Sequence, residues 1–224
     1  MSYSTVLFDL DGTLLNTLAD LRASMNRALA GFSFPPHTLE EVRSFVGNGI
    51  RDYTSRAVPA GTGDEIKERV LAAFKKDYAE HCMDDTVPYD GILPLLCELK
   101  ARGVKTAIVS NKADFAVQKL AQRYFDGLVT LSRGELPDVP KKPAPDMLYA
   151  VMDALGATKE TTLFVGDSDT DCLTAKNAGL DVVLVDWGFR DRALLCALAE
   201  AYPAPLHASV LSSVEALKSA ILGA

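Results

Sequence analysis

Residues 5–13, near the start of the chain, read TVLFDLDGT and decide the fold. The continuous apolar run at residues 6–8 predicts a short buried strand, and strands of this kind belong mostly to parallel sheets. Ligands bind such sheets at the carboxyl ends of the strands, where Asp9 and Asp11 would lie. Two crowded carboxylates repel each other unless a cation or a shared proton offsets their charge. Taken alone, the stretch is equally explained by a strand that ends in an Asp-Gly turn.

The chain after this strand divides into a helical part and an alternating part. Apolar residues at helical spacing fill residues 16–84, where Thr17 with Asp20 and Thr38 with Glu41 fit capping boxes. From residue 92 onward, helical segments alternate with apolar runs at 104–109, 127–131, 162–165, 182–185 and 208–211. Residues 132–143, rich in proline and charge, are expected to form a loop.

This alternation predicts an α/β protein with a doubly wound, Rossmann-like parallel sheet. We expect the sheet and its helices to comprise residues 1–15 and 86–224. Residues 16–85 would form an all-helical cap domain inserted after the first strand.

The overall composition excludes some classes of function. The 224 residues carry a net charge of -7, which disfavours binding to nucleic acid or to an anionic membrane. The four cysteines form no Cys-x-x-Cys pair, so reduced thiols are expected. The sequence shows no signal peptide and no run of ~20 apolar residues. The simplest interpretation is a cytoplasmic protein, either a monomer or a homodimer.

Three further polar clusters follow predicted strands or lie in the loops after them. Ser110 and Asn111 follow the strand at 104–109, Lys142 precedes the helix that begins near Asp146, and residues 166–171 read GDSDTD. Each has a simpler explanation when taken singly: a helix N-cap, a solvated lysine, and acids that favour a helix N-terminus. Together they would converge on one crevice of an open sheet, where the acids would favour Mg²⁺.

The order of these clusters resembles the four motifs of the haloacid dehalogenase (HAD) superfamily of phosphoryl-transfer enzymes. In detail the chain is similar to the capped phosphatases that include phosphoglycolate phosphatase. The segments that carry this resemblance are residues 9–20, 46–49, 88–91, 142–146 and 187–189.

The resemblance implies a role for each motif residue. Asp9 would be the nucleophile that forms an aspartyl-phosphate, and Asp11 would protonate the leaving oxygen and then activate water. Phosphoryl-binding residues would be Thr13, Ser110, Asn111 and Lys142. The Mg²⁺ ligands would be Asp9, the backbone carbonyl of Asp11, and Asp167, with Asp171 as a further ligand or a residue behind them.

Several points stay open in the sequence. Lys141 precedes Lys142 where this family often has glycine, so the assignment of the lysine depends on the spacing that follows. Asp169 is an additional acid that would face either solvent or the metal. The leaving group would be chosen by the cap, with Asn48 and Arg51 as candidates; Arg51 could pair with a substrate carboxylate, or lie on the surface.

The expected function is a Mg²⁺-dependent phosphatase acting on a small phosphorylated metabolite. A phosphosugar mutase or a pyrophosphatase on the same core is an alternative within enzymes. A binding module that accepts a phosphoryl group on an aspartate is the alternative outside them. The dehalogenase branch is disfavoured because it lacks the Asp-x-Asp-Gly-Thr pattern. The phosphonate-hydrolase branch is disfavoured because it lacks a second acid at the position of Asp11.

Overall fold

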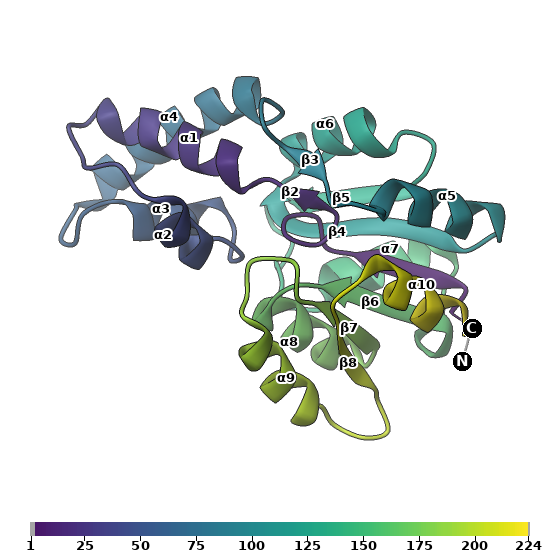
Figure 1. Cartoon of the computed structure of the whole chain (residues 1–224). Coiled ribbons are helices and arrows are strands. Elements are labelled where there is room, and N and C mark those ends of the chain that lie inside the picture. The colour runs from purple at the N-terminus through teal and green to yellow at the C-terminus, as the bar shows by residue number, and fades with distance from the viewer. Residues whose placement is uncertain (1–2, 224) are drawn as a thin grey trace.

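A computed structural model describes residues 3–223, and a six-stranded parallel sheet is its central feature (Figure 1). The strands lie in the order β5-β4-β1-β6-β7-β8. Their bounds are β1 Thr5–Phe8, β4 Lys105–Ala113, β5 Leu131–Glu135, β6 Thr162–Gly166, β7 Asp181–Val185 and β8 Ala208–Leu211. The α/β doubly wound fold predicted from the sequence is therefore confirmed.

Alternate residues of the strands pack against two separate helical layers. Val6 and Phe8 face the cluster formed with α5 (Ile92–Ala101), α6 (Asp114–Phe125) and α10 (Val214–Leu222). Leu7 faces the cluster formed with α7 (Asp146–Leu155), α8 (Asp169–Ala178) and α9 (Arg192–Glu200). Both faces are buried, which is why the strands read as continuous apolar runs.

Four helices between β1 and α5 form a separate bundle, at the left of Figure 1. They are α1 (Leu18–Ala30), α2 (Leu39–Phe45), α3 (Ile50–Ala57) and α4 (Asp64–His81). Met25, Val42 and Phe74 lie in the hydrophobic cluster of this bundle. The two connections to the sheet pair as a short antiparallel ribbon, β2 (Leu15–Asn16) with β3 (Val87–Pro88). The predicted cap boundaries, residues 16 and 85, lie beside this ribbon.

One of the two predicted capping boxes is wrong. Thr38 and Glu41 form the box as expected, whereas Thr17 makes no side-chain cap on α1. The hydroxyl of Thr17 instead donates to Oδ1 of Asp11 at 2.7 Å. The carboxylate of Asp20 accepts hydrogen bonds from the backbone N–H groups of residues 85 and 86, each at 2.9 Å. Both side chains therefore tie α1 to distant segments, which local sequence spacing does not show.

Two strand boundaries also differ from the predicted ones. The strand expected at 127–131 occupies Leu131–Glu135, and β4 extends to Ala113, beyond residue 109. The reason is pairing: Leu131 lies beside Ala107 in the parallel ladder, and Glu135 lies beside Ala113. At Gly134 the chains approach so closely that a Cβ would lie 2.5 Å from the Cα of Asp114. Pairing with β4, rather than apolar content, places β5.

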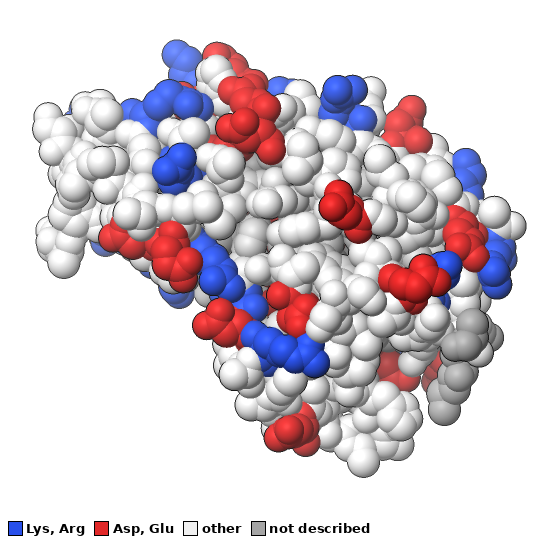
Figure 2. Space-filling view, viewed as in Figure 1, with Lys and Arg blue, Asp and Glu red and all other residues white. Residues whose placement is uncertain are grey.

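Acidic and basic side chains are interspersed on the face of the molecule drawn in Figure 2, without one broad basic area. Among the residues described, no helix combines the length and the apolar character that crossing a membrane requires.

Candidate active site

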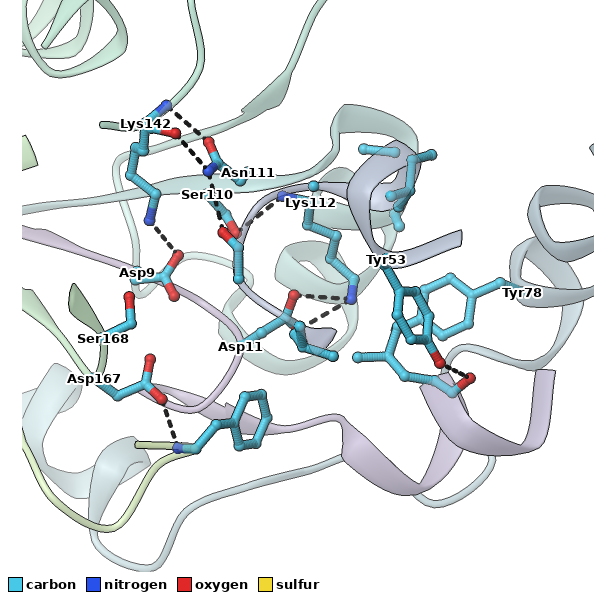
Figure 3. Close-up of a pocket in the computed structure, with 18 of the residues that line it drawn as sticks. Asp9, Asp11, Tyr53, Tyr78, Ser110, Asn111, Lys112, Lys142, Asp167 and Ser168 are labelled. Carbon is cyan, nitrogen blue, oxygen red and sulfur yellow. Dashed lines mark hydrogen bonds and ion pairs between the residues drawn. The ribbon is translucent and has the colours of Figure 1, made fainter. Parts of the chain in front are cut away.

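The carboxyl ends of three neighbouring strands bring the predicted motifs together (Figure 3). Asp9 directly follows β1, Ser110 lies on β4, and Asp167 directly follows β6. Register explains this convergence, because Phe8 pairs with Ile108 on one side and with Val165 on the other. The three side chains line one pocket between the sheet edge and the helical bundle.

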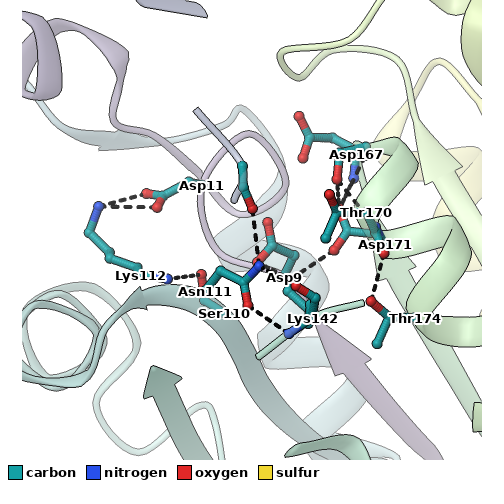
Figure 4. Close-up of polar contacts among 12 residues, drawn as sticks. Asp9, Asp11, Ser110, Asn111, Lys112, Lys142, Asp167, Thr170, Asp171 and Thr174 are labelled. Atoms are coloured by element: carbon teal, nitrogen blue, oxygen red, sulfur yellow. Dashed lines mark hydrogen bonds and ion pairs between the residues drawn. The ribbon is translucent and has the colours of Figure 1, made fainter. Parts of the chain in front are cut away.

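Lys142 is the buried cation of this cluster, with its side chain 2% exposed. Its Nζ lies 2.7 Å from Oδ1 of Asp9 and 2.7 Å from Oδ1 of Asp171 (Figure 4). The neighbouring Lys141 points elsewhere, and its Nζ donates to the backbone carbonyl of Asn48 at 2.7 Å. The structure therefore brings Lys142, and not Lys141, to the carboxylates.

Asn111 holds the backbone of Lys142 in place. Its side-chain carbonyl accepts from the N–H of Lys142 at 2.8 Å, and its Nδ2 donates to the carbonyl of Lys142 at 2.9 Å. The same Nδ2 lies 3.2 Å from the carbonyl of Gly47 in the helical bundle. The resemblance implies that Asn111 supports the binding of the phosphoryl group, and its side chain is engaged with the backbone of Lys142. The hydroxyl of Thr13, the other residue expected in a supporting role, is buried and has no hydrogen-bond partner among the residues described.

Asp9, Asp167 and Asp171 form a buried acidic cluster whose ligand atoms lie within 4.8 Å of one another. Burial, and then the charge of Asp171, raises the pKa of Asp167 well above its usual range. Burial also raises the pKa of Asp9 to about 6, although Lys142 opposes the rise. One lysine does not balance three carboxylates, so the donor set fits a divalent cation held by oxygen ligands.

The three acids are not equivalent as metal ligands. Oδ1 of Asp171 accepts from Lys142, while its Oδ2 accepts from the Ser168 hydroxyl at 2.6 Å and from the backbone N–H groups of residues 167 and 168. Asp167 uses Oδ2 to accept from the N–H of Phe189 at 2.6 Å. Oδ2 of Asp9 and Oδ1 of Asp167 have no hydrogen bond within residues 3–223, and these are the oxygens that fit a cation. Both oxygens of Asp171 are engaged by protein groups. These contacts fit the alternative in which Asp171 does not bind the metal directly but holds the residues around it.

Glycines allow this close arrangement of acids. A Cβ on Gly12 or Gly188 would lie 2.2 or 2.3 Å from Oδ2 of Asp167. A Cβ on Gly166 would lie 2.4 Å from the side chain of Asp171. Any larger residue at these positions would displace the carboxylates, so the glycines set the dimensions of the cluster.

Asp11 lies on the side of the pocket nearer the helical bundle and pairs with a lysine that sequence reasoning missed. Nζ of Lys112 is 3.0 Å from Oδ1 and 3.1 Å from Oδ2 of Asp11. The Lys112 side chain is 2% exposed, and its Nζ lies 4.7 Å from the ring centroid of Tyr78. The only signal in the sequence is that Lys112 continues the polar run of Ser110 and Asn111.

The loop at residues 46–49 of the helical bundle lies directly over the core. Asn48 accepts from Lys141 through its backbone, and from the Thr170 hydroxyl at 3.0 Å through its side chain. Arg190 donates to the carbonyl of Val46 at 2.7 Å and, through Nε, to Asp169 at 3.2 Å. Asp169 therefore does not point into the acidic cluster. It binds Arg190, which in turn holds the loop at residues 46–49.

Arg51 does not line the pocket. Its guanidinium pairs with Glu68 at the surface, with 61% of the side chain exposed. Of the two specificity candidates, Asn48 lies at the core and Arg51 faces away from it. The interpretation of Arg51 as a surface arginine, left open by the sequence, is the one that this geometry fits.

The model of the haloacid dehalogenase-like hydrolase family matches residues 6–185, well over half of the chain. The chain belongs to this family. Phosphoglycolate phosphatase 1 of Pseudomonas aeruginosa is 37% identical over 195 residues, which cover 82% of this chain and 70% of the relative. Phosphoglycolate phosphatase of Aquifex aeolicus is 31% identical over 189 residues, covering 82% of this chain and 85% of the relative.

A crystal structure agrees with this membership of the HAD-like family. A provisionally named phosphoglycolate phosphatase from Lactobacillus delbrueckii subsp. bulgaricus superposes with a TM-score of 0.92 at 33% identity, over 100% of both chains. The resemblance seen in the sequence is thereby confirmed, as is the prediction that the chain is a hydrolase of the phosphatase type.

Proposed function

We propose that the chain is a metal-dependent phosphatase for small phosphate monoesters, with phosphoglycolate as the first candidate substrate. The observation that carries the proposal is the buried acidic cluster beside Lys142. In it, Asp9 and Asp167 each keep one oxygen that has no hydrogen bond to any residue from 3 to 223. The names of the relatives supply the candidate substrate.

Asp9 is the proposed nucleophile. Its Oδ2 is the oxygen that would stay on the metal, and its Oδ1, which Lys142 holds, attacks phosphorus. The bond from this oxygen to phosphorus, an acyl phosphate, forms as the bond to the leaving oxygen breaks. Asp11 enters this step with a proton, gives it to the leaving oxygen, and is left as the carboxylate that Lys112 binds. It then takes a proton from the water that attacks the aspartyl-phosphate, which releases phosphate and restores Asp9.

The remaining residues bind and orient the phosphoryl group. Lys142 and the Ser110 hydroxyl would contact its oxygens, and Asp171 and Asn111 fix Lys142 in position. Mg²⁺ held by Asp9, Asp167 and the backbone carbonyl of Asp11 would offset negative charge on the phosphoryl oxygens. The helical bundle over the pocket would act as the cap that excludes bulk water.

The test is phosphate release from p-nitrophenyl phosphate and from phosphoglycolate, measured with Mg²⁺ and after its removal by a chelator. Asp9→Asn should lower kcat by about a thousandfold or more, because the amide is a poor nucleophile. Asp153→Asn, at an exposed position of α7, is the matched control.

Retention of activity in Asp9→Asn would disprove the assignment of the nucleophile. Full activity in the chelator would disprove the metal dependence. Stoichiometric labelling of the protein by a phosphoryl donor, without release of phosphate, would favour the phosphoryl-accepting module instead.

A further inference from the structure

The pocket holds a second polar centre, formed by Lys112 and Tyr78, beyond the groups that act on the phosphoryl group. Figure 3 shows Lys112 and Tyr78 on the opposite side of Asp11 from Lys142 and Ser110. Both residues line the pocket. This is the side on which the leaving group of the substrate must lie, because Asp11 exchanges a proton with the leaving oxygen.

The hydroxyl of Tyr78 is an unpartnered polar group at this centre. Tyr78 is 2% exposed, and its hydroxyl has no hydrogen-bond partner within residues 3–223. A buried polar group without a partner carries a cost in free energy that an arriving acceptor removes. Burial, and then the charge of Asp11, raises the pKa of Tyr78 well above its usual range, so the hydroxyl stays a donor.

Lys112 adds a positive charge over the ring of Tyr78. Its ammonium has three N–H donors, and Asp11 accepts two hydrogen bonds from it, at 3.0 and 3.1 Å. A third donor is therefore left for an oxygen of the substrate. The ring of Tyr78, 4.7 Å away, holds the ammonium by a cation–π contact.

The other cations of the pocket are engaged or exposed. Lys142 binds Asp9 and Asp171. The guanidinium of Arg190 binds Asp169 and backbone carbonyls of residues 43 and 46. Lys75 lines the pocket but is exposed. Among the residues described, Lys112 is the pocket cation that is buried and also lies over the ring of a residue, Tyr78, whose hydroxyl has no partner.

The wall around this centre is aromatic. Phe74 stacks on Tyr78 with ring centroids 5.3 Å apart, and meets Tyr53 edge-on at 5.4 Å. Tyr53 differs from Tyr78 because its hydroxyl donates to the carbonyl of Leu21 at 3.0 Å. Of these two tyrosine hydroxyls, that of Tyr78 is the one without a partner.

We propose that Lys112 and Tyr78 form a subsite that binds a carboxylate on the leaving group of the substrate. The proposal rests on the proposed function and deepens it, because it selects phosphate esters whose alcohol carries an acid group close to the ester oxygen. A leaving group without an acceptor would leave both donors unsatisfied, and a site of this kind strongly rejects such analogues.

The test compares phosphoglycolate with ethyl phosphate, in which a methyl group replaces the carboxylate. Tyr78→Phe should lower the ratio of their kcat/KM values by at least about tenfold, as expected for loss of a hydrogen bond to a charged group. Tyr53→Phe is the matched control, in which the ratio should change less than about twofold, since that hydroxyl serves the backbone. Lys112→Met should lower the ratio further, whereas Lys75→Met should not.

Equal kcat/KM values for the two esters in the unaltered protein would overturn the subsite while leaving the proposed phosphatase function intact. A fall of the ratio in Lys75→Met or Tyr53→Phe, but not in Tyr78→Phe, would also overturn it. If neither ester is hydrolysed, the proposed function fails. The subsite is then tested by thermal shift: a larger shift with phosphoglycolate than with ethyl phosphate, lost in Tyr78→Phe, supports it, and equal shifts overturn it.

Discussion

The acidic cluster predicts that stabilisation of the protein by Mg²⁺ depends on pH. Burial raises the pKa of Asp9 from 3.8 to about 6 in the folded, metal-free protein, and raises that of Asp167 in the same direction. A carboxyl whose folded pKa is raised binds more protons in the folded state than in the unfolded state. The free energy of unfolding of the metal-free protein therefore falls as pH rises from about 4 to about 6.

The magnitude follows from the size of the Asp9 shift. One pKa unit corresponds to ~1.4 kcal/mol, so ionised Asp9 costs the metal-free protein about 3 kcal/mol above pH 6. A bound divalent cation offsets this cost, and it also requires the ionised carboxylates. The increase in Tm caused by excess Mg²⁺ should be small at about pH 4.5 and several degrees larger at about pH 7.5.

The assay is thermal unfolding with and without Mg²⁺ across this pH range. Asp9→Asn should reduce the pH dependence of the Mg²⁺ effect, because it removes one of the titrating ligands. Asp153→Asn on the exposed face of α7 should leave the dependence unchanged. If the increase in Tm caused by Mg²⁺ is constant with pH, or is largest in acid, the reasoning is refuted. The ionised acids would then not destabilise the metal-free protein in the way that the cation is expected to offset.

Two further predictions concern the neighbours of the cluster. Lys142→Met should lower the free energy of unfolding of the metal-free protein by about 3 kcal/mol at about pH 7.5, since it leaves buried carboxylates without their cation. Denaturant unfolding measures this change. Lys141→Met should lower it by under about 1 kcal/mol, because that lysine donates to one backbone carbonyl. If Lys141→Met lowered the free energy of unfolding more than Lys142→Met does, Lys141 would be the lysine of the motif. Gly188→Ala should weaken Mg²⁺ binding in a calorimetric titration, because its Cβ would lie 2.3 Å from Oδ2 of Asp167. Gly63→Ala, where a Cβ meets nothing within 4 Å, is the control, and equal Mg²⁺ affinities in the two variants would contradict the role given to Gly188.

The sequence alone determined the sheet, the main elements and the principal motif residues. Local patterns were sufficient, because an apolar run between helical segments specifies a buried parallel strand. The carboxyl ends of such strands meet at one edge. This is why Asp9, Ser110 and Asp167 could be brought to one crevice from residues that lie far apart in the chain. Thr38 and Glu41 could be read as a capping box because both partners lie within one turn.

Only the tertiary structure decided which partner each polar side chain takes. Thr17 fits a capping box in the sequence, yet its hydroxyl binds Asp11. Asn111 fits a phosphoryl-binding residue, yet it holds the backbone of Lys142. Arg51 could pair with a substrate carboxylate or lie on the surface, and in the structure it faces solvent beside Glu68.

The stretch at residues 5–13 shows the division most clearly. Its sequence places two acids at the end of a buried strand, but says nothing of what balances them. In the structure Asp9 takes Lys142, 133 residues away, and Asp11 takes Lys112, 101 residues away. A charge is balanced by whichever opposite charge the folded chain brings within reach. Sequence spacing cannot report such a contact, so the sequence determined where the acids lie and the tertiary structure decided what each of them binds.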